Sequence, residues 1–234
     1  MPSVGLCCGS VAFNHIGLIH AVDRDVQNLV TVEFHDRTAH RGYHFDDNFK
    51  FDLAALGERG ALYACPAKGE QPSVIHYRAY QTWALSADWQ YNLPPGESTV
   101  AVGLGGVPPL SIDDDLAPAL GTGCAVVATD AGYLRFLSGS GIQLHLIDLG
   151  EEVVAVSVGR EWTFVVHRQN RIMADCKFSN LLKVRDIKCH DAARQNLSYT
   201  IFDCETFEII QRGEIPMMRK VNLTWIGFTE DQVS

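Results

Sequence analysis

Imidazole and carboxylate side chains are most concentrated between residues 35 and 47 of this sequence. The segment contains His35-Asp36, His40 and His44-x-Asp46-Asp47. Nitrogen and oxygen donors of these types bind zinc when they converge. Their spacing matches no metal-binding motif with a known mechanism, and strand alternation would place His35 and Asp36 on opposite faces. We therefore interpret the segment as a polar loop that makes side-chain hydrogen bonds, and we predict no metal site.

Two further segments have the composition of ligand-binding loops. Gly103-x-Gly105-Gly106 follows a predicted strand, but Pro108-Pro109 comes next, where a dinucleotide-binding fingerprint requires a helix. Asp113-Asp114-Asp115 could attract calcium, but the spaced oxygen ligands and distal glutamate of an EF-hand loop are missing. We interpret the acidic segment as a solvated turn, and we expect no nucleotide and no other cofactor.

The sequence contains no complete catalytic signature. It has no G-x-S-x-G motif and no Ser, Cys or Lys beside an evident base. The acidic residues near the starts of predicted strands, Asp52 and Glu152, do not form an obvious pair. We therefore predict that the chain is not an enzyme. Its four tryptophans are assigned to packing: Trp83, Trp89, Trp162 and Trp225.

The composition and net charge of the chain limit the functions that it could have. The 234 residues are 47% hydrophobic and 20% charged, as in globular proteins. The net charge of -9 argues against a broad phosphate-binding surface, and we interpret the basic residues between 168 and 188 as a solvated loop. Seven cysteines without a C-x-x-C pair indicate reduced thiols. We find no signal peptide and no apolar run near the ~20 residues that span a bilayer, so we expect no membrane association.

Short strands are the elements that would position these residues. Residues 124–167 contain five apolar runs separated by turns such as Asp130-Ala131-Gly132. Period-2 alternation between such turns predicts an antiparallel meander, which we interpret as core scaffold rather than a site. The runs are 124–129, 133–137, 142–149, 153–158 and 162–167.

The meander is part of a longer repeat. Similar strand segments recur near Asp52, Val100, Val154 and Leu223. When the irregular stretches 107–122 and 168–195 are set aside, each unit has roughly 40 to 50 residues and four strands, which is typical of a β-propeller blade. The sequence therefore predicts an all-β, WD40-like β-propeller.

The predicted propeller is incomplete. We expect three whole blades, at about residues 49–93, 98–149 and 152–212, within one domain spanning 1–234. Residues 11–34 are predicted to be the last three strands of a preceding blade, followed by the loop 35–47. Residues 223–228 are predicted to be the first strand of a following blade. Closed propellers have about four to eight blades, so we expect exposed edges and poor behaviour in isolation.

The stretch 168–195 interrupts the last whole blade between its second and third strands. It has little strand pattern and only a weak helical one. Two interpretations stay open: a genuine surface insertion, and an unspliced or mis-joined coding segment. Sequencing of the transcript would decide between them.

Five stretches of the chain resemble, in order, the central propeller of one protein family. They are Val32-Glu33-Phe34-His35-Asp36 with His40, Trp89-Gln90-Tyr91-Asn92-Leu93-Pro94-Pro95-Gly96-Glu97, residues 125–136, Val153-Val154, and Leu223-Thr224-Trp225-Ile226-Gly227-Phe228. The family is that of replisome adaptors known as chromosome transmission fidelity factor in yeast, minichromosome loss protein in fission yeast and acidic nucleoplasmic DNA-binding protein in animals. The stretch 168–195 departs from the family pattern.

The resemblance implies a non-enzymatic scaffold of DNA replication in the nucleus. In that family the central propeller mediates homotrimer formation. The protein links the replicative helicase, through the GINS complex, to DNA polymerase alpha, and it supports chromosome cohesion. A helical domain receives the partner peptides, and no residue of this sequence matches it, so no partner-contact residue is assigned. Because the chain is acidic, we expect chromatin association to be mainly indirect.

Two alternatives to this resemblance stay open. One is an unrelated propeller that serves as a protein-interaction module, since propellers commonly present rigid binding surfaces. The other is a propeller hydrolase, because propeller enzymes gather catalytic residues from several blades and need no local motif.

Overall fold

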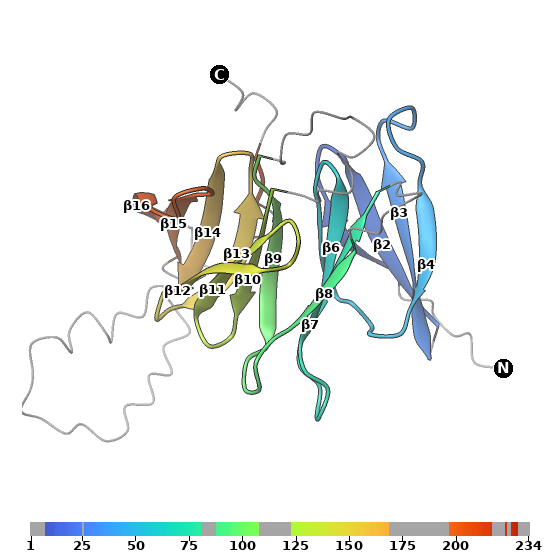
Figure 1. Ribbon diagram of the computed structural model, residues 1–234, viewed down its shortest axis with the longest axis horizontal. Coiled ribbons are helices and arrows are strands. Elements are labelled where there is room, and N and C mark those ends of the chain that lie inside the picture. Colours follow the sequence, from blue (N-terminus) through green and yellow to red (C-terminus); the bar gives the residue numbers. More distant parts are fainter. Residues whose placement is uncertain are drawn as a thin grey trace, which may run out of the picture.

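The computed structural model describes residues 8–24, 26–80, 88–107, 123–168, 197–216, 223 and 226–228. Within these residues, sixteen strands form four antiparallel sheets of four strands each, which we call blades 1 to 4 in chain order (Figure 1). This described part of the chain contains no helix with the length and hydropathy to span a bilayer.

In each blade, strands that follow one another in sequence are neighbours in the sheet. Blade 1 consists of β1 (Cys8–Phe13), β2 (Gly17–Arg24), β3 (Gln27–Phe34) and β4 (Tyr43–Asp47). Blade 2 consists of β5 (Leu53–Leu56), β6 (Gly60–Cys65), β7 (Val74–Ala79) and β8 (Trp89–Asn92). Blade 3 consists of β9 (Thr99–Gly105), β10 (Cys124–Thr129), β11 (Tyr133–Ser138) and β12 (Gln143–Asp148). Blade 4 consists of β13 (Glu152–Val158), β14 (Trp162–Arg168), β15 (Leu197–Asp203) and β16 (Ile209–Ile215).

Burial changes from the first strand of a blade to its last. Every residue of β6 and of β10 is buried, because a neighbouring blade covers each face of these strands. In β12, by contrast, only Ile147 is half-buried and the other residues are exposed. These two central strands therefore consist almost entirely of apolar residues, whereas outer strands can contain polar residues at many positions.

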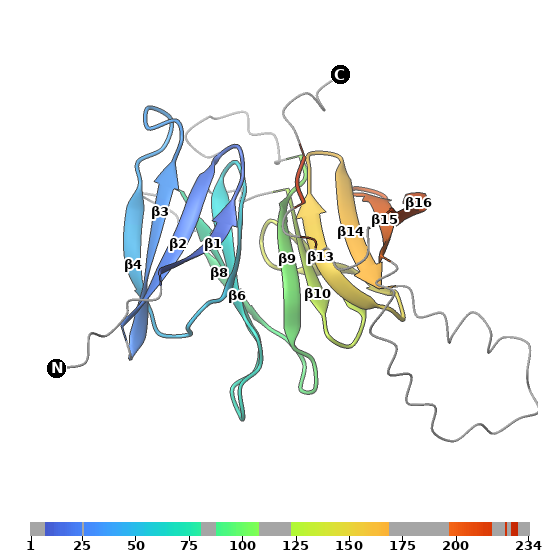
Figure 2. The ribbon, with the colours of Figure 1, turned by 180° about the vertical axis from the view of Figure 1, so that it is seen from behind.

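Three apolar cores lie between successive blades. The core between blades 1 and 2 includes Val30, Val32 and Tyr63. The core between blades 2 and 3 includes Tyr77, Val127 and Leu137. The core between blades 3 and 4 includes Val126, Phe136 and Phe202. The first strands β1, β5, β9 and β13 contact one another in that order, so the blades stand side by side around common inner strands (Figure 2). This is the arrangement of a β-propeller, which confirms the predicted fold class.

Blade 1 differs from the expectation. Its inner strand is β1, and residues 11–34 are therefore its first three strands rather than the last three of a preceding blade. The fourth strand, β4, lies within the segment predicted to be a loop. Tyr43 and Phe45 of β4 pack on the core, while His44 and Asp46 are exposed. The prediction was wrong because an outer strand faces water on one side, and its polar residues resemble those of a loop.

Several predicted features fall on residues that the structure does not describe. They are Trp83, Trp225, Asp113-Asp114-Asp115 and the stretch 168–195 beyond Arg168, which is the last residue of β14. The predicted strand 223–228 is described only at residues 223 and 226–228, and those residues form no strand. Phe228 nevertheless packs on Gly159, next to the end of β13, where the inner strand of another blade would lie.

Phe136 tests whether packing between blades stabilises the fold. Its side chain is fully buried, and its ring centroid lies 6.0 Å from that of Phe202 and 5.0 Å from that of Phe207. We expect Phe136→Ala to lower the free energy of unfolding by about 3–5 kcal/mol, because it leaves a cavity in the core. Urea unfolding followed by circular dichroism measures this. The control Ile142→Ala changes a side chain that is 65% exposed, and a similar loss in both variants would contradict the expectation.

Candidate functional site at the inner strands

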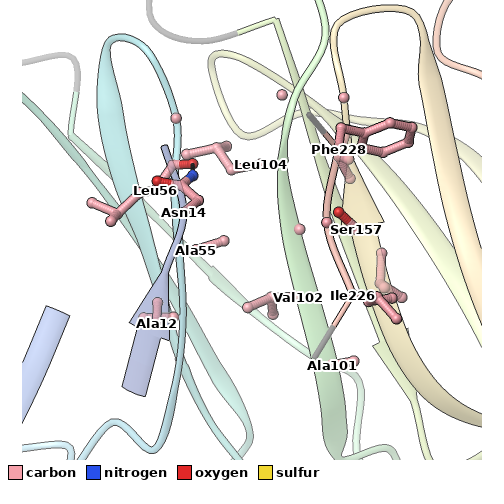
Figure 3. A pocket seen from close by; sticks show the side chains of 18 of the residues that line it. Ala12, Asn14, Ala55, Leu56, Ala101, Val102, Leu104, Ser157, Ile226 and Phe228 are labelled. Carbon is pink, nitrogen blue, oxygen red and sulfur yellow. Dashed lines mark hydrogen bonds between the residues drawn. The ribbon is translucent and has the colours of Figure 1, made fainter. Parts of the chain in front are cut away.

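The inner strands line a cavity. The cavity has a volume of about 690 Å³ and is lined by β1, β5, β9, β13 and residues 226–228. Ala55 of β5 and Val102 of β9 lie on opposite sides of the open space, with Ser157 and Phe228 beside β13 (Figure 3). Small side chains therefore leave the centre of the blade array open.

The glycines of β9 allow blades 3 and 4 to approach closely. A Cβ atom on Gly103 would overlap the side chains of Val156 and Val158, and a Cβ atom on Gly105 would overlap the backbone of β13. The N–H of Gly106 donates a hydrogen bond of 2.8 Å to the carbonyl of Gly159. The G-x-G-G sequence, which resembles part of a nucleotide-binding motif, thus has a packing role here.

The cavity presents little polar chemistry. Asn14 lines it, but its amide nitrogen donates to the carbonyl of Leu56 at 2.8 Å and its amide oxygen accepts from the N–H of Ile16 at 2.9 Å. Charged lining residues are confined to the connections after the strands, at Glu58, Arg160 and Glu161. The described lining is therefore suited to apolar contact, and it contains no nucleophile hydrogen-bonded to a base.

The histidine-rich segment does not converge on one point. Asp36 accepts hydrogen bonds from the hydroxyl and N–H of Thr38 and from the N–H of Ala39, and the hydroxyl contributes most to lowering the pKa of Asp36. The ring of His40 packs against Phe34 and Tyr80. His44 and Asp46 lie on the exposed face of β4. Within the described residues, no group of three or more His, Cys, Asp or Glu side chains is arranged to hold a metal ion.

Asp47 accepts hydrogen bonds through its carboxylate from the backbone of the connection between blades 1 and 2. Its carboxylate is buried and accepts hydrogen bonds from the N–H groups of Phe49, Lys50 and Phe51 at 2.8, 3.1 and 2.6 Å. Burial raises the pKa of Asp47, and the three donors oppose that shift. The residue thus stabilises a turn, and the sequence pattern of acidic residues did not distinguish this role from metal binding.

A buried ion pair joins blades 2 and 3. Arg135 of β11 donates from Nε and Nη2 to the two carboxylate oxygens of Glu97, at 3.0 and 2.5 Å. Its Nη1 donates at 2.6 Å to Gln143, which also accepts from the hydroxyl of Tyr91 at 3.0 Å. The side chains of Arg135 and Glu97 are only 7% and 12% exposed. This pair is not evident in the sequence, because its members are 38 residues apart and lie in a turn and a strand of ordinary composition.

A second buried network lies in blade 4. Nδ1 of His167 is paired with Glu151, and Nε2 lies 2.9 Å from the hydroxyl of Thr200. A hydroxyl, an imidazole and a carboxylate in this order resemble a catalytic triad. However, Thr200 is 1% exposed and lies outside the cavity lining, so its hydroxyl is closed to substrate. We assign the network to packing of the sheet.

Truncation of Arg135 tests the ion pair between blades. We expect Arg135→Ala to lower the free energy of unfolding by about 3–5 kcal/mol, because it leaves Glu97 buried without its partner. The control is Arg168→Ala, which removes the exposed pair of Arg168 with Glu152 and is expected to cost about 1 kcal/mol or less. Urea midpoints of both variants provide the comparison. Equal losses of stability in the two variants would show that the buried pair contributes no more than the exposed pair.

Burial of His167 should make the stability of the folded chain depend on pH. Burial lowers its pKa in the folded state and nearby Arg212 lowers it further, while Glu151 opposes this without reversing it. The unfolded chain then binds a proton more readily than the folded chain, so this contribution is full above about pH 6.5 and is lost as the pH falls below that value. We expect thermal unfolding temperatures to drop from pH 7.5 to 5.5, and the drop to be smaller in His167→Gln. An unchanged drop would assign the effect to other groups, such as His76, whose pKa is also lowered by burial.

The comparisons with known proteins agree with this geometry. The family model described as Minichromosome loss protein, Mcl1, middle region matches residues 10–234. Minichromosome loss protein 1 of Schizosaccharomyces pombe is 37% identical over 138 residues, which are 58% of this chain and 15% of that protein. WD repeat and HMG-box DNA-binding protein 1 of Homo sapiens is 27% identical over 223 residues, which are 94% of this chain and 17% of that protein.

A third relative is named for a binding partner. DNA polymerase alpha-binding protein of Saccharomyces cerevisiae is 26% identical over 159 residues, which are 67% of this chain and 15% of that protein. The chain thus spans 15–17% of the length of these three relatives. Two of the three names refer to binding, one of DNA and one of DNA polymerase alpha. Because the family model covers nearly the whole sequence, the resemblance is confirmed, and the chain belongs to the Mcl1 middle-region family.

Proposed function

We propose that this chain is the middle propeller of a non-enzymatic adaptor in DNA replication. The observation that carries the proposal is the family match over residues 10–234, which include residues of all four blades. The match also removes the alternative of an unrelated propeller module. No contact within the described residues favours the hydrolase alternative, since the networks of Arg135 and His167 are buried.

The partners in this proposal are inferred from the relatives of the chain. One relative is named for binding DNA polymerase alpha, and another is named for binding DNA. We infer that the longer protein works in the nucleus beside DNA polymerase alpha and links it, through GINS, to the replicative helicase. Support of chromosome cohesion and assembly as a homotrimer through the propeller belong to the same proposal.

The charge of the chain supports contact with chromatin through partners. Its net charge is -9, whereas direct phosphate binding requires a basic surface. Apolar cores between blades keep the sheets in fixed positions, so the perimeter and the loops offer a stable surface for other proteins.

Affinity purification of the full-length protein from S-phase nuclei tests the adaptor role. We expect DNA polymerase alpha and GINS to be recovered with the tagged protein after nuclease treatment, because the links are between proteins. Absence of both partners from the wild-type sample would overturn the role in replication.

The mass of the purified full-length protein tests assembly. Light scattering is expected to give three copies for the wild type and fewer for Phe136→Ala, because the variant weakens the packing between blades 3 and 4 and so destabilises the propeller that holds the copies together. Val26→Ala, at a position 84% exposed in blade 1, is the control and should stay trimeric. A monomeric wild-type protein would contradict trimerisation. The adaptor role would then still be tested separately by the affinity purification.

A further inference from the structure

The outer edge of blade 3 presents an apolar row to solvent. β12 is the last strand of its sheet, and no other described strand pairs with its outer edge. Three aliphatic side chains in this row are 65%, 54% and 42% exposed, namely Ile142, Leu144 and Leu146. Leu144 has no partner residue on β11, because the pairing shifts register between Phe136 and Leu137. Such a bulge redirects the side chain of the extra residue.

This edge lacks the features that usually prevent strand pairing. Edge strands are commonly protected by lysine, proline or other charged residues. Residues 142–147 read IQLHLI and contain none of these, and the one charged residue of β12 is Asp148 at its end. Two other outer strands contain charged residues, namely Asp46 and Asp47 in β4 and Arg212 and Glu214 in β16. The outer strand β8 also lacks charged residues, but it has only four residues and its apolar side chains, Trp89 and Tyr91, are half-buried. Among these described strands, β12 thus combines an edge without lysine or proline with two exposed leucine side chains, Leu144 and Leu146.

Completion of the propeller would leave this edge free. Blade 3 lies between blades 2 and 4, which cover its two faces. Additional blades would pack on the free faces of blades 1 and 4, whereas β12 lies on the perimeter (Figure 1). The exposure of Leu144 and Leu146 therefore does not depend on blades beyond the four described here.

The surroundings of β12 are acidic. The ring of His145 stacks on Phe207 at a centroid distance of 5.1 Å, which places the turn between β15 and β16 beside β12. Glu205 and Glu208 are exposed in that turn, and Asp148 is exposed at the end of β12. None of these three carboxylates is in an ion pair within the described residues. Ile209 and Ile210 of β16, which follow this turn, are also exposed.

We propose that the outer edge of β12 binds an extended segment of a partner protein by β-strand addition. Main-chain hydrogen bonds would join the segment to the edge, and its alternate apolar side chains would cover Leu144 and Leu146. Lysine or arginine residues between the apolar positions would complement Glu205, Glu208 and Asp148. The inference depends on the edge itself and holds whatever the role of the longer protein in replication.

A synthetic peptide tests this site on the whole chain. The probe is a fluorescein-labelled peptide of alternating Lys and Val, and its anisotropy measures binding. We expect the wild-type chain to bind it, and a peptide with N-methyl groups on alternate amides to bind at least about tenfold more weakly, because it cannot complete the strand pairing. A peptide of the same composition with its Lys and Val residues in separate blocks should also bind weakly.

Two variants locate the site on the chain. Leu144→Asp is expected to weaken binding by at least about tenfold, while Val26→Asp, which adds the same charge at another exposed position, is expected to leave it unchanged. Circular dichroism confirms that both variants are folded. Equal binding of the N-methylated peptide, or equal losses in the two variants, would overturn the proposal. A wild-type chain that self-associates, and dissociates on Leu144→Asp, would assign the edge to a second copy and overturn it as well.

Discussion

Burial of both faces of the central strands β6 and β10 is the constraint on which this structure depends. β6 and β10 are buried at every residue, and this is achieved only when neighbouring blades pack on each side. A single four-stranded sheet could not bury both faces of these strands, since at least one apolar face would be exposed to water. The three cores between blades therefore hold the chain together, and the small residues of the inner strands follow from the need to bring four sheets close to one axis.

A carboxylate lies in or directly before each connection between blades, and each has a different set of partners. Asp47 accepts from backbone N–H groups, Glu97 binds Arg135, and Glu151 is paired with His167. Removing such groups from water costs free energy, so these contacts offset that cost and add little by themselves. Their geometry suits one relative position of the blades, and we hypothesise that they favour the native arrangement over a shifted one. Double-mutant cycles across Glu97 and Arg135 would detect a coupling between the two residues if they act together.

The inner cavity has few free polar groups, whereas the outer strands carry side chains that a partner could contact. The cavity is lined mainly by aliphatic residues, and the buried histidine and arginine networks are bonded within the protein. The outer strands, in contrast, expose side chains and unpaired strand edges. This distribution is compatible with the proposed role of the chain as part of an adaptor.

The sequence alone determined the strands, the blade repeat and the family, because alternation and turn residues act over a few neighbouring positions. The fold class follows from this pattern, as do the strands of blades 2 to 4. Only the tertiary structure decided that blade 1 has β4 as its fourth strand, that Arg135 meets Glu97, and that Leu144 faces solvent. These outcomes depend on which sheet lies beside which, and such contacts join residues far apart in the chain. For the same reason, aliphatic residues in a predicted strand could not be divided between core and binding surface until the neighbouring blades were in place.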